Sequence, residues 1–386
     1  MSWESVKLED ISSGIQTGPF GSQLHQSDYT EDGTPVVMPK DLIGGKISEQ
    51  SIARVGAEHV QRLQRHIIQN GDILYSRRGD VGRCAFATER ETGWLCGTGC
   101  LRVTVNPRVA DKKFVFYQLQ QSSTIDWVEK HAVGATMLNL NTKILSNIPV
   151  FLPPIETQHR IADILSAYDG LFQNNRKQIK LLEEAAQRLY KEWFVDLRFP
   201  GHEHTKIVDG VPEGWEKRTV GSLIDKPIRT KQIPTADYQT DGMIPVIDQS
   251  REFIAGYTND TESLVQSNVP VIVFGDHTRI LKLIQFPFAK GADGTQLICS
   301  SSNHMPQRLL YCSLLNIDLS NYHYARHFKY LKAEVIFVPT VEIANLFESI
   351  AEPLYTKVQR CREICYQAQQ ARDRLLPKLM TGEVEV

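Results

Sequence analysis

Residues 152–194 read LPPIETQHRIADILSAYDGLFQNNRKQIKLLEEAAQRLYKEWF, and residues 338–380 read VPTVEIANLFESIAEPLYTKVQRCREICYQAQQARDRLLPKLM. The two segments align without a gap at a constant offset of 186 positions. Each begins with a short apolar run that ends in proline, and apolar residues then recur at alternating intervals of four and three. That spacing is typical of the seam between two packed helices. The sequence therefore predicts two long helices whose seams pack against each other.

The second predicted helix contains Pro353, which has no backbone N–H, so we expect a break or kink near Glu352. Cys361 and Cys365 occupy seam positions, and none of the seven cysteines has a zinc-ligand neighbour at the required spacing. Reduced and mostly buried thiols are therefore expected. The predicted seam residues are Ile161, Leu165, Tyr168, Phe172, Ile179, Leu182, Leu189, Trp193, Phe347, Leu354, Val358, Leu375 and Leu379.

A longer repeat is visible outside the helices. Trp3-Glu4 recurs as Trp215-Glu216, and Ile73-Leu74-Tyr75-Ser76 has a counterpart in Ile272-Val273-Phe274-Gly275. The order of module and helix is thus present twice, which indicates a tandem duplication. Short apolar runs separated by turn-forming residues predict strands, and two further runs predict short helices. The strands are expected at Pro35–Met38, Asp72–Tyr75, Leu101–Val105 and Val269–Phe274, and the short helices at Phe114–Gln121 and Arg308–Leu315.

These patterns together predict an α+β fold with a pseudo-twofold tandem repeat. Two similar, strand-rich modules are separated by two long helices packed as an antiparallel coiled coil. The predicted boundaries are 1–152 and 212–338 for the modules, 153–196 and 339–386 for the helical regions, and 197–211 for a linker rich in turn formers.

The charge balance excludes a simple basic DNA-binding protein. The formal net charge is −2, residues 1–152 carry 16 basic and 16 acidic side chains, and residues 212–338 carry 13 of each. A module that binds nucleic acid must therefore use a local patch, or a partner must supply part of the phosphate contact. The chain has no run of 18 apolar residues and no signal-peptide pattern at its N-terminus, so we expect a cytoplasmic protein with no membrane contact.

Catalytic motifs are missing from the sequence. It contains no GxxxxGK[ST] loop, no GxGxxG after a strand, no HExxH and no [DN]PP[YF] tetrapeptide. Asp111-Lys112-Lys113 resembles part of a nuclease motif, but no Pro-Asp pair precedes it nearby, which favours a solvated charged turn. We therefore predict a non-catalytic chain without a metal or cofactor of its own.

Polar loops of the first module are candidates for DNA contact. The segment 17–23 combines glycines, a proline and an aromatic residue between polar residues, which suits main-chain contact with phosphates and side-chain contact with base edges. The alternative is a tight turn with Phe20 packed inward. Paired arginines after a strand suit phosphate or guanine, or alternatively form salt bridges with Asp80. The candidate residues are Thr17, Gly18, Pro19, Phe20, Gly21, Ser22, Gln23, Lys40, Ser76, Arg77 and Arg78.

The second module has corresponding candidates after its own buried strand. Further polar loops lie at 291–295 and 324–329. His277, His323 and His327 do not form a compact metal-ligand pattern, so hydrogen-bonding or core histidines are favoured over a metal site. The candidate DNA-contacting residues here are Gly275, Asp276, His277, Thr278, Arg279, Arg326 and His327.

Several of these segments resemble one family. Pro153-Pro154-Ile155-Glu156-Thr157-Gln158-His159 and the segment 189–196 resemble its first conserved region. Val211-Pro212-Glu213-Gly214-Trp215 resembles the entry to its second recognition domain, and residues 374–383 resemble its C-terminal signature. Gly18–Ser22 and Gly275–Arg279 also resemble motifs of its recognition domains. The resemblance covers essentially the whole chain, and the family is the specificity (S) subunit of type I restriction–modification enzymes.

The resemblance implies a non-catalytic subunit that binds double-stranded DNA. Each module would be a target recognition domain that reads one half of a bipartite, gapped and asymmetric target. The helices would set the gap and dock two methyltransferase (M) subunits, and motor–nuclease (R) subunits would complete the complex. S-adenosylmethionine, ATP and Mg²⁺ would belong to those partners. The second helix begins with Thr340-Val341-Glu342 and lacks the Pro-Pro and Gln of the first, so we expect unequal docking faces.

Three other functions compete with this one. A DNA-recognition subunit of a related methyltransferase-only or type II-like system would look the same in sequence, and neighbouring reading frames would distinguish it. If the chain were a coiled-coil scaffold, its module loops would contribute nothing to DNA binding. A self-contained nuclease or methyltransferase is disfavoured by the missing motifs.

Overall fold

The structure is a computed structural model that describes residues 3–20, 22–134, 137–226, 228–267, 270–322 and 326–386. Gly21, Val269 and His323, which entered the sequence analysis, lie outside the described residues. The contacts divide the chain into two compact units. Unit 1 contains residues 1–172 and 366–386, and unit 2 contains residues 173–365. Each unit therefore combines one strand-rich module with parts of both long helices.

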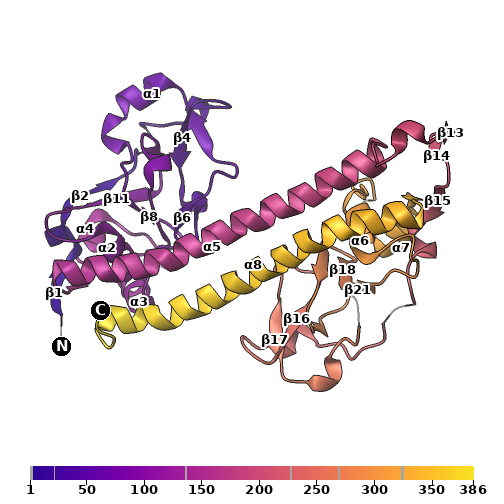
Figure 1. The fold of residues 1–386 in the computed structure, drawn as a ribbon. Helices are drawn as coiled ribbons and strands as arrows, with labels where there is room; N and C mark the ends of the chain where they lie inside the picture. Colours follow the sequence, from indigo (N-terminus) through magenta and orange to yellow (C-terminus); the bar gives the residue numbers. More distant parts are fainter. Residues whose placement is uncertain (1–2, 21, 135–136, 227, 268–269, 323–325) are drawn as a thin grey trace. The chain divides into compact units, whose positions relative to one another are not determined.

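The two long helices are α5 (Ile155–Tyr190), followed by a π-helical turn at Lys191–Val195, and α8 (Val341–Thr381), drawn in magenta and yellow in Figure 1. In unit 1, Ile161 and Leu165 of α5 share a core with Leu379 of α8. In unit 2, Trp193 shares a core with Phe347 of α8. Early residues of α5 thus meet late residues of α8, and late ones meet early ones. The predicted antiparallel packing of the helices is confirmed within each unit.

The predicted seam residues are buried to different degrees. Leu354 is only half-buried, and its neighbour Tyr355, which the 4-3 spacing did not select, is 2% exposed. Tyr355 packs edge-on against Tyr311 of the module, with ring centroids 5.6 Å apart. Ile161, Leu165, Trp193, Phe347, Val358 and Leu379 are buried, whereas Tyr168, Phe172, Ile179, Leu182, Leu189 and Leu375 are half-buried.

A break or kink was predicted near Glu352, and the break is wrong, because α8 continues through Pro353 without interruption. Pro353 removes one N–H from the helical ladder, which would have bonded to the carbonyl of Ser349. Both residues are exposed, so water can replace the lost donor. The packed face of the helix, with Ala351 and Tyr355, is unaffected.

The module of unit 1 contains two four-stranded sheets. In the first, β8 is central and pairs antiparallel with β11 and β9, and β2 pairs with the other edge of β11. In the second, β4 lies between antiparallel β7 and parallel β10. The strands are β1 (Glu4–Lys7), β2 (Ser12–Thr17), β3 (Tyr29–Thr30), β4 (Thr34–Val37), β5 (Leu42–Ile43), β6 (Lys46–Ile47), β7 (Ala53–Val55), β8 (Ile73–Ser76), β9 (Cys84–Phe86), β10 (Leu95–Cys96), β11 (Cys100–Val105) and β12 (Pro149–Leu152), and the helices are α1 (Ala57–Arg62), α2 (Lys112–Leu119), α3 (Ser122–His131) and α4 (Thr142–Ser146).

The module of unit 2 repeats these pairings. Here β18 is central between antiparallel β19 and β21, and β16 lies between antiparallel β17 and parallel β20. In both modules an N-terminal strand pairs with the strand that precedes the long helix, β1 with β12 and β15 with β22. The predicted α+β tandem repeat is thus confirmed. The elements are β15 (Glu216–Thr219), β16 (Ile244–Ile247), β17 (Gly256–Thr258), β18 (Val271–Gly275), β19 (Leu281–Ile284), β20 (Ala289–Lys290), β21 (Thr295–Ile298), β22 (Val335–Val338), α6 (Gln307–Leu315) and α7 (Phe328–Ala333).

The segment predicted as a linker is ordered and packs into unit 2. Phe199 is buried against Trp215, with ring centroids 4.7 Å apart. The hairpin of β13 (Ile207–Val208) and β14 (Val211–Pro212) follows it. Trp215 therefore anchors the start of the second module to the end of the first long helix, where Phe194 also contacts its ring.

All seven cysteines are free thiols, of which six are buried and Cys299 is half-buried, as predicted. Within the described part of the chain, the His, Cys, Asp and Glu side chains form no group of three that could hold a metal ion. None of the described helices combines the length and the apolar character needed to cross a bilayer.

Candidate nucleic-acid interface

Four loops of unit 1 meet where the central strand β8 ends. The Gly97 N–H donates to the Val37 carbonyl at 2.9 Å, and the Arg77 N–H donates to the Gly99 carbonyl at 2.8 Å. The Gly18 N–H donates to the Cys100 carbonyl at 2.9 Å. We call this meeting point, formed by residues 17–20, 37–40, 76–79 and 97–99, junction 1. Main-chain hydrogen bonds hold it together, and the side chains of Phe20, Lys40 and Arg78 are exposed.

Glycines allow the loops of junction 1 to approach each other this closely. A Cβ atom on Gly18 would overlap the carbonyl oxygen of Gly97. Gly99 has a φ of +87°, in the region that favours glycine, and a Cβ there would lie 3.2 Å from Cγ of Pro39. Gly18, predicted to bring main chain close to a ligand, therefore first brings main chain close to main chain.

The side chains of the predicted loops come together at this junction. The Arg77 guanidinium lies over the Phe20 ring, 5.8 Å from its centroid, and Phe20 is 50% exposed, so the alternative of an inward-packed Phe20 is wrong. Arg78 is exposed. Asp80 pairs with Arg83 at 2.8 Å, and in the described part of the chain no carboxylate lies within ion-pair distance of Arg77 or Arg78.

The remaining candidates of the first module support the loops or lie at their rim. Pro19 is buried, and the Gln23 side chain accepts a hydrogen bond from the Phe20 N–H at 3.1 Å. The Ser76 hydroxyl is buried and donates to the Arg78 carbonyl at 3.0 Å. Ser22 is exposed, Thr17 is half-buried, and exposed Lys40 donates to the Ser51 carbonyl at 2.8 Å.

Unit 2 repeats two of these three main-chain hydrogen bonds at the end of β18. The Gly291 N–H donates to the Ile247 carbonyl at 2.8 Å, as Gly97 does to Val37. The Asp276 N–H donates to the Gly294 carbonyl at 2.7 Å, as Arg77 does to Gly99, and Gly294 has a φ of +83°. Residues 247–250, 275–279 and 291–294 form this junction 2. The internal repeat in the sequence aligned the central strands of the two modules. It gave no sign that the loops after these strands share a hydrogen-bonding frame.

The candidates at junction 2 divide into exposed and structural residues. His277 and Thr278 are exposed at the turn after β18, together with Arg279, whose φ of +62° lets the chain reverse there. Arg279 also donates from Nη1 to the Leu319 carbonyl at 2.9 Å. Gly275 is buried, and a Cβ on it would overlap the Thr278 hydroxyl.

Asp276 and His327 are buried, unlike the other polar candidates of this module. Oδ1 of Asp276 accepts from the Phe328 N–H at 2.7 Å and so caps the start of α7. The His327 N–H donates to the Asp276 carbonyl at 2.9 Å. These two residues hold the loop of Arg326, which is exposed, against the end of β18.

A buried lysine, which the sequence analysis missed, lies beneath junction 2. Nζ of Lys282 donates to the carbonyl of Asp248 at 2.9 Å and to that of Glu252. Burial lowers the pKa of Lys282 to about 8, although the nearby Asp248 and Glu252 carboxylates act in the opposite direction. A lysine flanked by apolar residues in strand β19 was the available signal. This ammonium fixes the main chain at 248–252.

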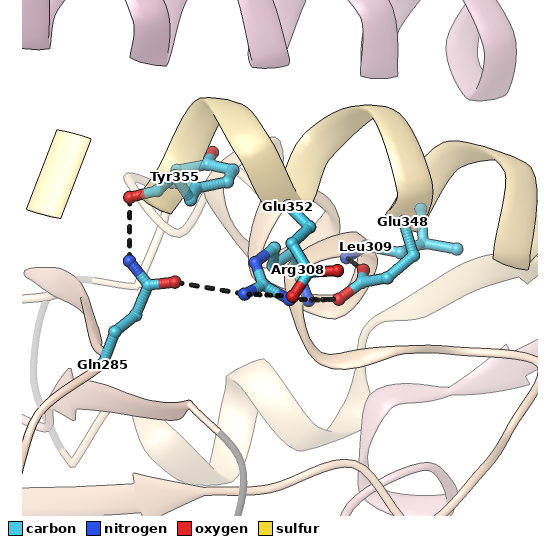
Figure 2. Close-up of polar contacts among 6 residues, drawn as sticks. All are labelled: Gln285, Arg308, Leu309, Glu348, Glu352 and Tyr355. Carbon is cyan, nitrogen blue, oxygen red and sulfur yellow. Dashed lines mark hydrogen bonds and ion pairs between the residues drawn. The ribbon is translucent and has the colours of Figure 1, made fainter. Parts of the chain in front are cut away.

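The two modules are attached to the long helices in different ways. In unit 2 the Arg308 guanidinium of α6 pairs with Glu348 at 2.9 Å and with Glu352 at 3.3 Å, both on α8 (Figure 2). Nη2 of Arg308 also donates to Gln285 at 3.2 Å, and the Gln285 amide donates to the Tyr355 carbonyl at 2.8 Å. This set of contacts forms a polar clamp between the module and the helix.

Unit 1 uses a glutamine and a tyrosine instead. Gln158, in the predicted first conserved region, donates to the Pro153 carbonyl at 2.8 Å and accepts from the Asp111 N–H at 2.9 Å. The Tyr117 hydroxyl donates to Asp169 of α5 at 2.7 Å, and Arg372 of α8 pairs with Asp169 at 2.8 Å. The Tyr117 hydroxyl contact and the Arg372 ion pair thus share one carboxylate.

Comparison with known proteins identifies the chain. Residues 2–184 match the family model described as the type I restriction modification DNA specificity domain. The whole chain is 24% identical to the MjaIX specificity subunit of Methanocaldococcus jannaschii, an alignment that covers 94% of that protein. Residues 2–184 therefore belong to the type I restriction modification DNA specificity domains, and the chain over its whole length is similar to a specificity subunit. Another specificity subunit, HindI of Haemophilus influenzae, is 26% identical over 50% of this chain and 41% of its own length.

A solved specificity subunit shares the fold of this one. The crystal structure of the type I restriction–modification S subunit from M. genitalium matches 98% of this chain and 96% of its own, with a TM-score of 0.64 and 17% sequence identity. The matched DNA specificity domain of the present subunit contains all of junction 1. Junction 1 therefore lies in the part of the chain whose family is defined by DNA specificity.

Proposed function

We propose that this specificity subunit reads a bipartite, gapped and asymmetric target in double-stranded DNA, one half-site with each junction. One observation supports this proposal above all others. Both modules build the same frame of main-chain hydrogen bonds at the end of their central strand, and different side chains project from it. A shared frame with Arg77 and Arg78 in one module and His277 and Thr278 in the other suits two readers of different sequences.

The chemistry of the exposed side chains fits this role. Arginine donates two parallel hydrogen bonds to guanine or to a phosphate, and neither Arg77 nor Arg78 is neutralised by a carboxylate in the described part of the chain. Hydroxyl and imidazole groups such as those of Thr278 and His277 can donate to or accept from base edges. The near-neutral modules are expected to share phosphate contact with partner subunits.

The helices have the second role in the proposed function. We infer that α5 and α8 set the length of the gap and dock two methyltransferase (M) subunits, with motor–nuclease (R) subunits joining for cleavage. Methyl transfer from S-adenosylmethionine and the ATP- and Mg²⁺-dependent steps then belong to those partners, and this chain is non-catalytic. The polar clamp in unit 2 and its different counterpart in unit 1 support unequal docking of the two M subunits.

A methylome tests the proposal directly. The chain is co-expressed with its neighbouring M subunit in a host that lacks the modification, and the genome is sequenced with modification-sensitive reads. We expect methylated adenine in a two-part, gapped, non-palindromic motif. A purified complex with the M subunit that methylates no such motif would contradict DNA reading by the junctions and would favour a coiled-coil scaffold.

A further inference from the structure

Gln249 lies at the centre of junction 2 and bonds to both of the other loops. Its Oε1 accepts from the His277 N–H at 3.1 Å, and its Nε2 donates to the Asp293 carbonyl at 2.9 Å. Its own carbonyl accepts from the Thr278 hydroxyl at 2.6 Å. One side chain therefore ties the turn after β18 to the loop after β20, while its main chain holds the next residue of the turn.

The packing around Gln249 is as close as its hydrogen bonding. A Cβ atom on Gly294 would lie 2.8 Å from Nε2 of Gln249 and 2.8 Å from Cδ2 of His277. A Cβ on Gly275 would lie 2.9 Å from Cβ of Gln249. Glycines on both loops thus leave room for this amide. A displacement of Gln249 would release the exposed turn that carries His277 and Thr278.

The equivalent residue in junction 1 is Pro39, which cannot act in this way. Pro39 follows β4 as Gln249 follows β16, and it packs on Gly99 as Gln249 packs on Gly294. Proline has no side-chain donor or acceptor, and the half-buried Arg77 there lies over the Phe20 ring instead. The side-chain hydrogen bonds of Gln249 therefore have no counterpart at Pro39 in the first module, whereas the main-chain frame is common to both modules.

We propose that Gln249 is the positioning residue that sets the base preference of the second recognition module. This inference rests on the proposed function of junction 2. Both groups of the amide are already engaged within the protein, so Gln249 acts through His277 and Thr278. Discrimination between bases requires donors and acceptors at fixed positions, whereas attraction to phosphates does not. Loss of the amide should therefore relax sequence preference more than it weakens DNA binding.

The test compares three variants of the full chain, each co-expressed with the M subunit and examined by methylome sequencing. Gln249→Met keeps the length of the side chain and removes both hydrogen bonds. Gln249→Glu keeps the acceptor for the His277 N–H and loses the donor to the Asp293 carbonyl. The matched control is Gln239→Ala in the same module, where the side chain bonds only to Asn259 among the described residues, at 3.1 Å.

For Gln249→Met we expect discrimination at one or more positions of one half-site to fall by about tenfold or more. The gap and the second half-site should remain unchanged in Gln249→Met. That unchanged half-site should be the one that Arg77→Ala and Arg78→Ala alter. Gln249→Glu should give a smaller relaxation, and Gln239→Ala none. In vitro, affinity for non-specific DNA should change less than the ratio between the target and single-base variants of it.

Two results would overturn the role of Gln249. One is an unchanged motif in Gln249→Met, and the other is an equal loss of both half-sites. Circular dichroism and the thermal unfolding midpoint of each variant show whether an equal loss reflects misfolding. If Gln249→Met is misfolded, Gln249→Glu tests the proposal instead. Relaxation of one half-site by Gln249→Glu would support the role of Gln249, and an unchanged motif would overturn it. A wild-type chain that gives no bipartite motif would instead contradict the proposed function, so the two failures are distinguishable.

Discussion

Arg77 and Arg78 are adjacent in sequence but differ in their surroundings. Arg77 lies over the exposed Phe20 ring, whereas Arg78 is exposed and, among the described residues, is held only through its main chain. We expect Arg77→Ala and Arg78→Ala each to weaken DNA binding by about 1–3 kcal/mol where a base contact is lost, because a bidentate pair to guanine is worth that much. If the contact is to phosphate, the slope of log affinity against log salt should fall by about one.

Titrations of the M–S complex with target DNA at several salt concentrations measure both effects. Arg83→Ala is the matched control, since Arg83 belongs to the same turn but is paired with Asp80. Unchanged affinity, salt slope and target in both arginine variants would remove the two residues from the interface.

Lys282 makes the stability of the second module depend on pH. Its pKa is about 8 in the folded protein, below the ordinary 10.5, so the folded state disfavours the charged form. Between pH 8 and 10.5 the unfolded chain binds this proton and the folded chain does not, so the free energy of unfolding rises with pH in that window. Below pH 8 both states are protonated and the contribution is constant. The total change is about 3 kcal/mol for a shift of this size.

The pH dependence is measured on the difference in unfolding free energy between the wild type and Lys282→Met. That difference should be flat below pH 8 and should move in favour of the wild type from pH 8 to pH 10. The exposed Lys329→Met variant should show no such window. A pH-independent difference for Lys282→Met would mean that the ammonium is as well stabilised in the fold as in water.

At the scale of elements, the polar clamp between α6 and α8 should be sensitive to the loss of one partner. Arg308 is 8% exposed, and Arg308→Ala would leave Glu348 partly buried without a cation. Breaking a buried pair in this way costs about 3–5 kcal/mol, and the partial exposure of Glu352 places our expectation at about 3 kcal/mol of unfolding free energy. Urea unfolding measures the loss, with the exposed Arg360→Ala on α8 as control.

Unit 1 suggests the compensating change. The long-helix offset of 186 places Ala162 where unit 2 has Glu348, so unit 1 has an apolar residue at that position. Replacing both partners of a buried ion pair by apolar groups of similar size is often neutral or stabilising. We therefore expect Arg308→Phe combined with Glu348→Ala to recover most of the stability lost in Arg308→Ala. A double variant less stable than the single one would show that the clamp contributes more than an apolar contact of similar size.

Local patterns predicted the elements well and their long-range contacts poorly. The 4-3 spacing is a property of each helix alone, so both long helices were found from the sequence. Tyr355 was missed because its burial depends on Tyr311, which comes from a different element. The frame of each junction was missed for the same reason. It joins residues such as Val37, Arg77 and Gly99 through main-chain atoms, and main-chain atoms leave no residue-type signal.

The exposed residues of the candidate site were therefore predicted, whereas the residues that hold its loops in place were not recognised. The arginines and the turn after β18 stood out as polar residues after apolar strands. Gln249 gave no comparable signal, because glutamine at a strand end is common on protein surfaces. Asp276 looked like a contact residue, yet its carboxylate caps α7. Only the folded chain shows which polar groups are already bonded.

At the scale of the whole molecule, the two long helices that are proposed to set the length of the gap can be lengthened. Seven residues inserted after Phe172 in α5 and seven after Cys365 in α8 would fall at the limits of the two units and would preserve the heptad spacing. Each insertion adds about 10 Å of helix at 1.5 Å per residue. At 3.4 Å per base pair the gap should grow by about three base pairs, with both half-sites unchanged.

The methylome of the double-insertion variant shows the new gap directly. An insertion in α5 alone is the control, because it mismatches the two seams and should abolish methylation. A changed half-site in the double-insertion variant would mean that the helices shape the reading surfaces and do not simply separate them.

The main-chain frame of the junctions has a consequence for how such a protein can change over generations. The bonds that hold each frame join peptide groups, so folding constrains the glycines strongly and constrains exposed positions such as Arg78, His277 and Lys40 hardly at all. Mutations at those positions can accumulate without loss of the folded state. Under the proposed function, selection for stability and selection for a new target would therefore act on different residues, and a lineage could replace its recognition sequence in single steps, each of which yields a folded subunit.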